Sequence, residues 1–77
     1  MLATYQEIRD RIYELARQHD LRPDWPESTK SVRLLLLFDR GQVVVARAMV
    51  PVRPMDPDLL AALERSLEGV FGKDWMQ

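Results

Sequence analysis

The sequence contains no cysteine and a single histidine among its 77 residues. Without cysteine the chain has neither disulfides nor thiolate metal ligands, and one histidine cannot supply the ligands of a transition-metal centre. We expect no cofactor, because each of the three glycines has a turn or cap role and no phosphate-binding loop is available. The missing cysteine also fits a reducing compartment, and a cytoplasmic location is predicted.

Long apolar stretches are also missing. No stretch approaches the ~18 to 20 uncharged apolar residues that a membrane span requires, so no membrane partner is expected. Residues 1–7 lack the basic start and apolar core of a secretory signal, so nothing in them predicts export. Apolar residues make up 47% of the chain and charged residues 30%, which is typical of a folded globular domain. We expect one domain over residues 1–77, with a thin core.

The net charge of −1 conceals an uneven distribution. Residues 30–53 carry five cations and one anion, whereas residues 54–77 carry two cations and five anions. The basic segment is suited to nucleic acid, but the acidic segment can also balance it within one chain or between subunits. The nearly neutral total argues against a dedicated polyanion binder.

The first third of the chain predicts a helix followed by an extended loop. Thr4 and Glu7 form a capping-box pattern, and apolar residues recur at steps of three and four over about residues 5–19. Residues 20–30 contain two prolines, each of which disfavours helix in the residue before it. We therefore expect an extended loop over residues 20–30.

The most apolar stretch, residues 31–53, predicts an antiparallel β-hairpin. A three-residue turn at 39–41, with Gly41 in the left-handed conformation, pairs Phe38 with Gln42. In this register one face of the hairpin is wholly apolar and is expected to face the helices. Its even-numbered residues are Val32, Leu34, Leu36, Phe38, Val44, Ala46, Ala48, Val50 and Val52.

The odd-numbered face of the predicted hairpin divides into two parts. Apolar side chains lie near the turn, and Arg33 lies opposite Arg47 near the open end. Two like charges placed side by side are unfavourable. We therefore expect an acidic side chain of this protein or of a second copy, or a nucleic-acid phosphate, to lie over them.

A second helix is predicted over about residues 57–68, where Asp56 caps the helix and Pro57 occupies its first position. A C-terminal tail, residues 69–77, follows. The fold class is α+β, a small α-β-β-α domain with both helices on one face of the hairpin. A two-stranded ribbon is rarely stable alone. We therefore expect a homodimer whose first strands pair across a two-fold axis into a four-stranded sheet.

No catalytic motif is present, so the protein is predicted not to be an enzyme, and no small-molecule substrate is evident. We expect a non-catalytic protein-interaction module, a small adaptor or inhibitor that binds a larger protein and also itself. The excess of arginine over lysine, nine to two, suggests a bacterial or phage accessory protein. The residues assigned to the protein interface are apolar residues of the hairpin and the two tryptophans: Val32, Leu35, Leu37, Val43, Val45, Met49, Trp25 and Trp75.

Nucleic-acid binding is the alternative function. Three residues of the first helix at four-residue spacing place two guanidiniums beside a tyrosine, a geometry suited to phosphates or bases. The candidate anion or nucleic-acid contacts combine these residues with the hairpin arginines: Arg9, Tyr13, Arg17, Arg33, Arg47 and Arg53. Trp25 leaves two interpretations open, a cap on the end of a small core or an anchor for a partner.

Overall fold

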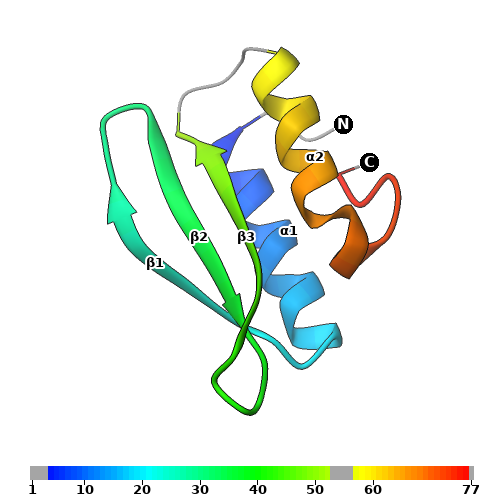
Figure 1. The fold of residues 1–77 in the computed structure, drawn as a ribbon. Helices are drawn as coiled ribbons and strands as arrows, with labels where there is room; N and C mark the ends of the chain where they lie inside the picture. Colours follow the sequence, from blue (N-terminus) through cyan, green and yellow to red (C-terminus); the bar gives the residue numbers. More distant parts are fainter. Residues whose placement is uncertain (1–3, 53–56, 77) are drawn as a thin grey trace.

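The computed structural model describes residues 4–52 and 57–76 of the chain. It confirms the α+β class, with two helices and one three-stranded antiparallel sheet in the order β1-β2-β3. The elements in chain order are α1 Tyr5–Gln18, β1 Arg22–Ser28, β2 Val32–Phe38, β3 Val44–Pro51 and α2 Pro57–Phe71. Both helices pack on the same side of the sheet (Figure 1). None of the described helices is long and apolar enough to cross a membrane.

Helix α1 begins as its sequence predicts. The Thr4 side chain accepts a hydrogen bond from the backbone N–H of Glu7, and the Glu7 side chain accepts one from Thr4 in return. Its buried side chains recur at three- and four-residue steps, so one face of the helix enters the core. Helix α2 runs three residues beyond its predicted end at residue 68 and stops before Gly72, whose φ is +94°.

The predicted extended loop 20–30 contains a third strand. Strand β1 pairs antiparallel with β2, with Arg22 opposite Phe38 and Ser28 opposite Arg33, and a bulge interrupts the pairing. Its two prolines are tolerated because β1 is an edge strand. The edge of β2 that was predicted to pair with a second copy is therefore occupied by β1. Association with a second copy stays a prediction.

The hairpin turn lies one residue further along the chain than predicted. The Asp39 N–H donates to the Val43 carbonyl (3.0 Å), and the left-handed residue is Gln42, with φ +64°, rather than Gly41. The cause is the Asp39 side chain, whose Oδ1 accepts hydrogen bonds from the N–H groups of Gly41 (2.8 Å) and Val43 (3.0 Å). These two bonds hold residues 40–42 as the loop.

A bulge at Val45 then changes the register of the hairpin. Phe38 lies opposite Val44, but Leu37 lies opposite Ala46. A one-residue shift moves every following side chain to the other face relative to its partner strand. Beyond the bulge, odd-numbered residues of β2 therefore share a face with even-numbered residues of β3.

This register corrects the predicted core. Leu35 and Leu37 of β2 are fully buried against the helices, together with Ala48 and Val50 of β3. The prediction that even-numbered residues face the helices is right for β3 after the bulge and wrong for β2. The helical and C-terminal core residues are Ile8, Ile12, Leu15, Ala16, Leu60, Leu63, Leu67, Phe71, Trp75 and Met76.

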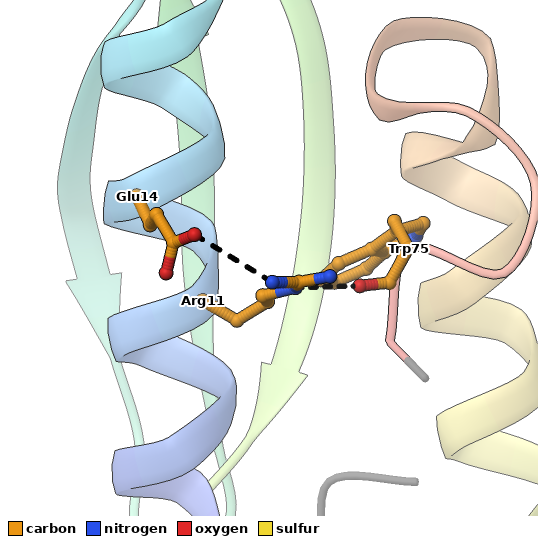
Figure 2. A network of polar contacts seen from close by, with 3 residues as sticks. All are labelled: Arg11, Glu14 and Trp75. Carbon is orange, nitrogen blue, oxygen red and sulfur yellow. Dashed lines mark hydrogen bonds and ion pairs between the residues drawn. The ribbon is translucent and has the colours of Figure 1, made fainter.

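The C-terminal segment joins the two helices. Trp75 is 3% exposed, its ring meets Phe71 edge-on at 5.6 Å, and its Nε1–H donates to the Glu64 carbonyl (2.9 Å). The Trp75 carbonyl accepts a hydrogen bond from Arg11 Nε on α1 (3.0 Å), and Arg11 also pairs with Glu14 (Figure 2). Residue 75 therefore belongs to the core and connects α2 to α1.

We predict that Trp75→Ala lowers the free energy of unfolding by about 3–5 kcal/mol, the cost of a large cavity in a core. That loss is comparable to the whole stability of a small domain. Trp75→Phe keeps the ring packing but loses the Nε1 donor, so it is expected to cost less. Urea denaturation followed by far-UV circular dichroism measures both. A loss below about 1 kcal/mol for the alanine variant would show that Trp75 is not a core residue.

Gln42→Gly is predicted to raise the free energy of unfolding by about 1 kcal/mol, because glycine adopts a positive φ without a Cβ clash. The matched control is Gln42→Ala, which loses the same hydrogen bond from Arg22 (3.1 Å) but keeps the left-handed penalty. Thermal unfolding compares the two variants. Equal stability of the glycine and alanine variants would contradict a left-handed conformation at this position.

Candidate functional site

The face of the sheet opposite the helices is apolar, and no element within the described residues packs on it (Figure 1). Side chains alternate between faces along a strand, so the outer face receives the even-numbered residues of β2 and the odd-numbered residues of β3 after the bulge. Val44, Val45 and Met49 are 45%, 42% and 53% exposed. The outer face consists of these apolar residues: Val32, Leu34, Leu36, Phe38, Val44, Val45 and Met49.

Charged side chains of opposite sign flank the leucines of this face. Asp24 and Glu27 on β1 lie opposite Leu36 and Leu34, and Arg47 on β3 lies on the other side of Leu36. None of these three charged side chains forms a hydrogen bond or ion pair with another described residue. Arg22 also lies on this face of β1, opposite Phe38 and stacked on its ring at 4.7 Å. The β1 flank therefore carries one cation and two carboxylates, the centre is apolar, and the β3 flank carries Arg47.

Strand β3 forms one free edge of the sheet. The Val52 N–H donates to the Ser31 carbonyl (2.8 Å), so in the antiparallel pattern the even-numbered residues before it also point their backbone groups toward β2. The odd-numbered residues then point outward, and Pro51 has no N–H to offer there. A groove of about 340 Å³ follows this edge and is lined by Leu34, Arg47, Ala48, Met49 and Ser66.

The predicted interface residues of the hairpin separate into two groups. Val43, Val45 and Met49 are exposed, and Val32 is half-buried on the outer face. Leu35 and Leu37 are 0% exposed and lie beneath the helices, so their assignment to an interface is wrong. The cause is the bulge, which turns these two side chains toward the core.

The two tryptophans serve the core. The Trp25 Nε1–H donates to the Tyr13 hydroxyl (2.9 Å), and its ring lies edge-on to Tyr5 at 6.3 Å. Trp25 is half-buried against the core cluster, which favours the core-cap interpretation over the partner anchor. The assignment of Trp75 to an interface is wrong, because its side chain is buried between the helices.

The hairpin arginines do not lie together. Arg33 stacks over the Tyr5 ring at 4.9 Å and donates to its hydroxyl (3.3 Å), which places it on the helical side. Arg47 lies on the outer face, opposite Leu36. The predicted Arg33–Arg47 contact is therefore wrong, because it depended on a register without the bulge. Arg53 lies outside the described residues.

The arginine and tyrosine side chains of α1 lie in part as predicted. The Arg9 guanidinium lies 4.8 Å from the centre of the Tyr13 ring. Tyr13 and Arg17 line a groove of about 500 Å³ between the end of α1 and the hairpin turn, which is completed by Asp20, Leu21, Arg22, Pro23, Asp39, Arg40 and Gln42. Most charges of this groove have partners: Arg40 pairs with Asp20, and Arg22 stacks on Phe38 at 4.7 Å.

The described residues have three features that bear on metal binding and acid–base chemistry. No group of three or more His, Cys, Asp or Glu side chains among them is placed to hold a metal ion. His19 is exposed at the end of α1, with its ring 5.8 Å from Phe71. The Asp39 carboxylate, in the larger groove, is engaged by the N–H groups of its own turn.

No protein-family model, curated protein or solved structure matches this chain. The structure shows a small α+β domain whose sheet is covered on one face by the described helices and uncovered by described residues on the other. The outer face is therefore the candidate functional surface.

Sequence reasoning missed most of this surface. It assigned Leu34, Leu36 and Phe38 to the core, and it did not consider Asp24 and Glu27 because β1 was predicted to be a loop. The alanines of β3 were placed on the helical face correctly, but β2 carries leucine on both faces and gives no signal of which one is buried.

We predict opposite sensitivities for two neighbouring leucines of β2. Leu35→Ala should cost about 2–5 kcal/mol of unfolding free energy, because the side chain is fully buried. Leu34→Ala should cost about 1 kcal/mol or less at low micromolar concentration, because it lies on the outer face. Urea denaturation of both variants tests the assignment of faces, and a larger loss for Leu34→Ala would reverse it.

Proposed function

We propose that this protein is a non-catalytic protein-interaction module, a small adaptor or inhibitor that binds a larger protein through the outer face of its sheet. The observation that carries the proposal is the uncovered row of valines, leucines and methionine on β2 and β3. An exposed apolar patch with a polar rim is typical of a protein-binding surface. Burial of such a patch provides the driving force for association.

The larger groove supports a non-catalytic role. Its carboxylates have structural partners, since Asp20 pairs with Arg40 and Asp39 accepts the N–H groups of the turn. The Arg40–Asp20 pair joins the hairpin turn to the end of α1, and the Asp39 carboxylate holds the turn itself.

Nucleic-acid binding is supported by one observation, the stacking of Arg9 on the exposed ring of Tyr13. Stacked arginine and aromatic side chains suit single-stranded bases and phosphates. The separation of Arg33 from Arg47 on opposite faces weakens this alternative. Binding that weakens steeply as the salt concentration rises would support it.

The test is affinity capture from extracts of the source organism, followed by mass spectrometry. The double variant Val45→Glu, Met49→Glu places two charges on the exposed part of the outer face. The matched control is Leu59→Glu, which makes the same kind of change at a 46% exposed position on α2. We expect the wild type and the control to retain the same larger protein and the double variant to lose it.

Two results would overturn the proposal. The first is an identical set of captured proteins for the wild type and the double variant. The second is recovery of nucleic acid instead of protein, with nuclease treatment abolishing all capture.

A further inference from the structure

The outer face is electrostatically complementary to itself. Asp24 and Glu27 occupy the β1 flank together with Arg22, which stacks on Phe38, and Arg47 occupies the β3 flank. Asp24, Glu27 and Arg47 form no hydrogen bond or ion pair with another described residue. In an interface with a two-fold axis, a residue i that contacts residue j of the second copy is itself contacted by the same pair in reverse, so the surface must be complementary to itself. A β1 flank with one cation and two carboxylates, a net charge of −1, and a β3 flank with Arg47, a charge of +1, fulfil this requirement.

The direction of the two-fold axis decides which flanks meet. When two such sheets face each other about an axis parallel to the strands, β1 of one copy lies over β3 of the other, and acid meets base. An in-plane axis perpendicular to the strands at the level of Leu36 places β1 over β1 and β3 over β3. Asp24 then meets Asp24 and Arg47 meets Arg47, while Arg22 meets Glu27, so two like-charge contacts form that the parallel axis avoids. Unpaired like charges oppose association, so the charge pattern selects the parallel axis.

We infer that in the free protein a second copy of the same chain covers the outer face, packed face to face about an axis parallel to the strands. Asp24 and Glu27 of one copy then oppose Arg47 of the partner subunit. This inference rests on the proposed function, because it names the partner of the same apolar surface. The larger protein binds by displacing the second copy.

The dimensions of the face fit this arrangement. Facing sheets pack about 10 Å apart, a separation that an extended arginine and an aspartate span together. Asp24 and Arg47 both flank Leu36, so they lie at the same level along the strands. A parallel axis preserves this level and places Asp24 opposite the partner's Arg47. Leu34 and Leu36 of the central strand then lie near the axis and pack against their symmetry mates.

The size of the face sets the expected affinity. Three strands of about seven residues cover an area of roughly 23 Å by 14 Å. This is small against the roughly 800 Å² per partner of a standard interface. We therefore expect a reversible dimer with a Kd in the micromolar range.

The test is sedimentation equilibrium over about 1 to 500 μM protein, with charge reversals as probes. The wild type is expected to reach twice the 9.0 kDa monomer mass. Arg47→Glu and Asp24→Arg each bring like charges together across the interface and should weaken the dimer at least about tenfold. The combined variant, Asp24→Arg with Arg47→Glu, restores opposite charges and should recover the dimer.

The matched controls reverse the same charges on the exposed side of α2. Arg65→Glu and Glu68→Arg change the net charge equally but lie away from the outer face, so they should leave the dimer unchanged. Circular dichroism confirms that each variant is folded.

Three results would overturn the inference. The first is a monomer mass for the wild type over the whole range. The second is a dimer that Arg47→Glu dissociates and Asp24→Arg does not, which indicates contact through the β3 edge. The third is failure of the combined variant to recover the dimer. If the wild type is monomeric and its capture of a larger protein still requires Val45 and Met49, the inferred dimer is excluded and the proposed function is retained.

Discussion

The bulge at Val45 is the constraint on which the rest of the structure depends. The turn alone pairs Phe38 with Val44 and keeps even-numbered residues of both strands on one face. The extra residue then turns β3 relative to β2, so that Ala46 lies opposite Leu37 on the helical side. Large residues of the central strand are thereby combined with small residues of the edge strand, where α2 packs closely against β3.

The bulge also determines which apolar residues remain outside. Strand β2 is apolar on both faces apart from Arg33, and the chain supplies helices for only one of them. The C-terminal segment does not cover the second face, because Trp75 and Met76 are buried on the helical side. A domain this small has no further segment among its described residues to cover the outer face, and this is why the candidate site is an apolar surface rather than a cleft.

The sequence predicted elements whose signals are local. The capping box at Thr4 and the periodic apolar residues after it are sufficient for α1, and Pro57 marks the start of α2. The features that were missed depend on contacts between residues far apart in the sequence, or on alternative pairings that the sequence does not distinguish. A strand with leucine on both faces gives no indication of which face is buried, so the predicted orientation of β2 depended on its register with β3, which the bulge at Val45 changes. Much of the candidate site was missed with it.

The sheet edges support the proposed association through the face rather than through a strand. Strand β1 contains Pro23 and Pro26, and β3 ends at Pro51, so both free edges contain residues without an N–H for a further ladder. The face has no such obstacle, since its apolar centre extends across β2 and β3 and its flanks carry complementary charges. A further strand could bury little of this centre, because it would lie beside the sheet. A surface packed on the face removes the apolar side chains from water directly, which is the larger driving force.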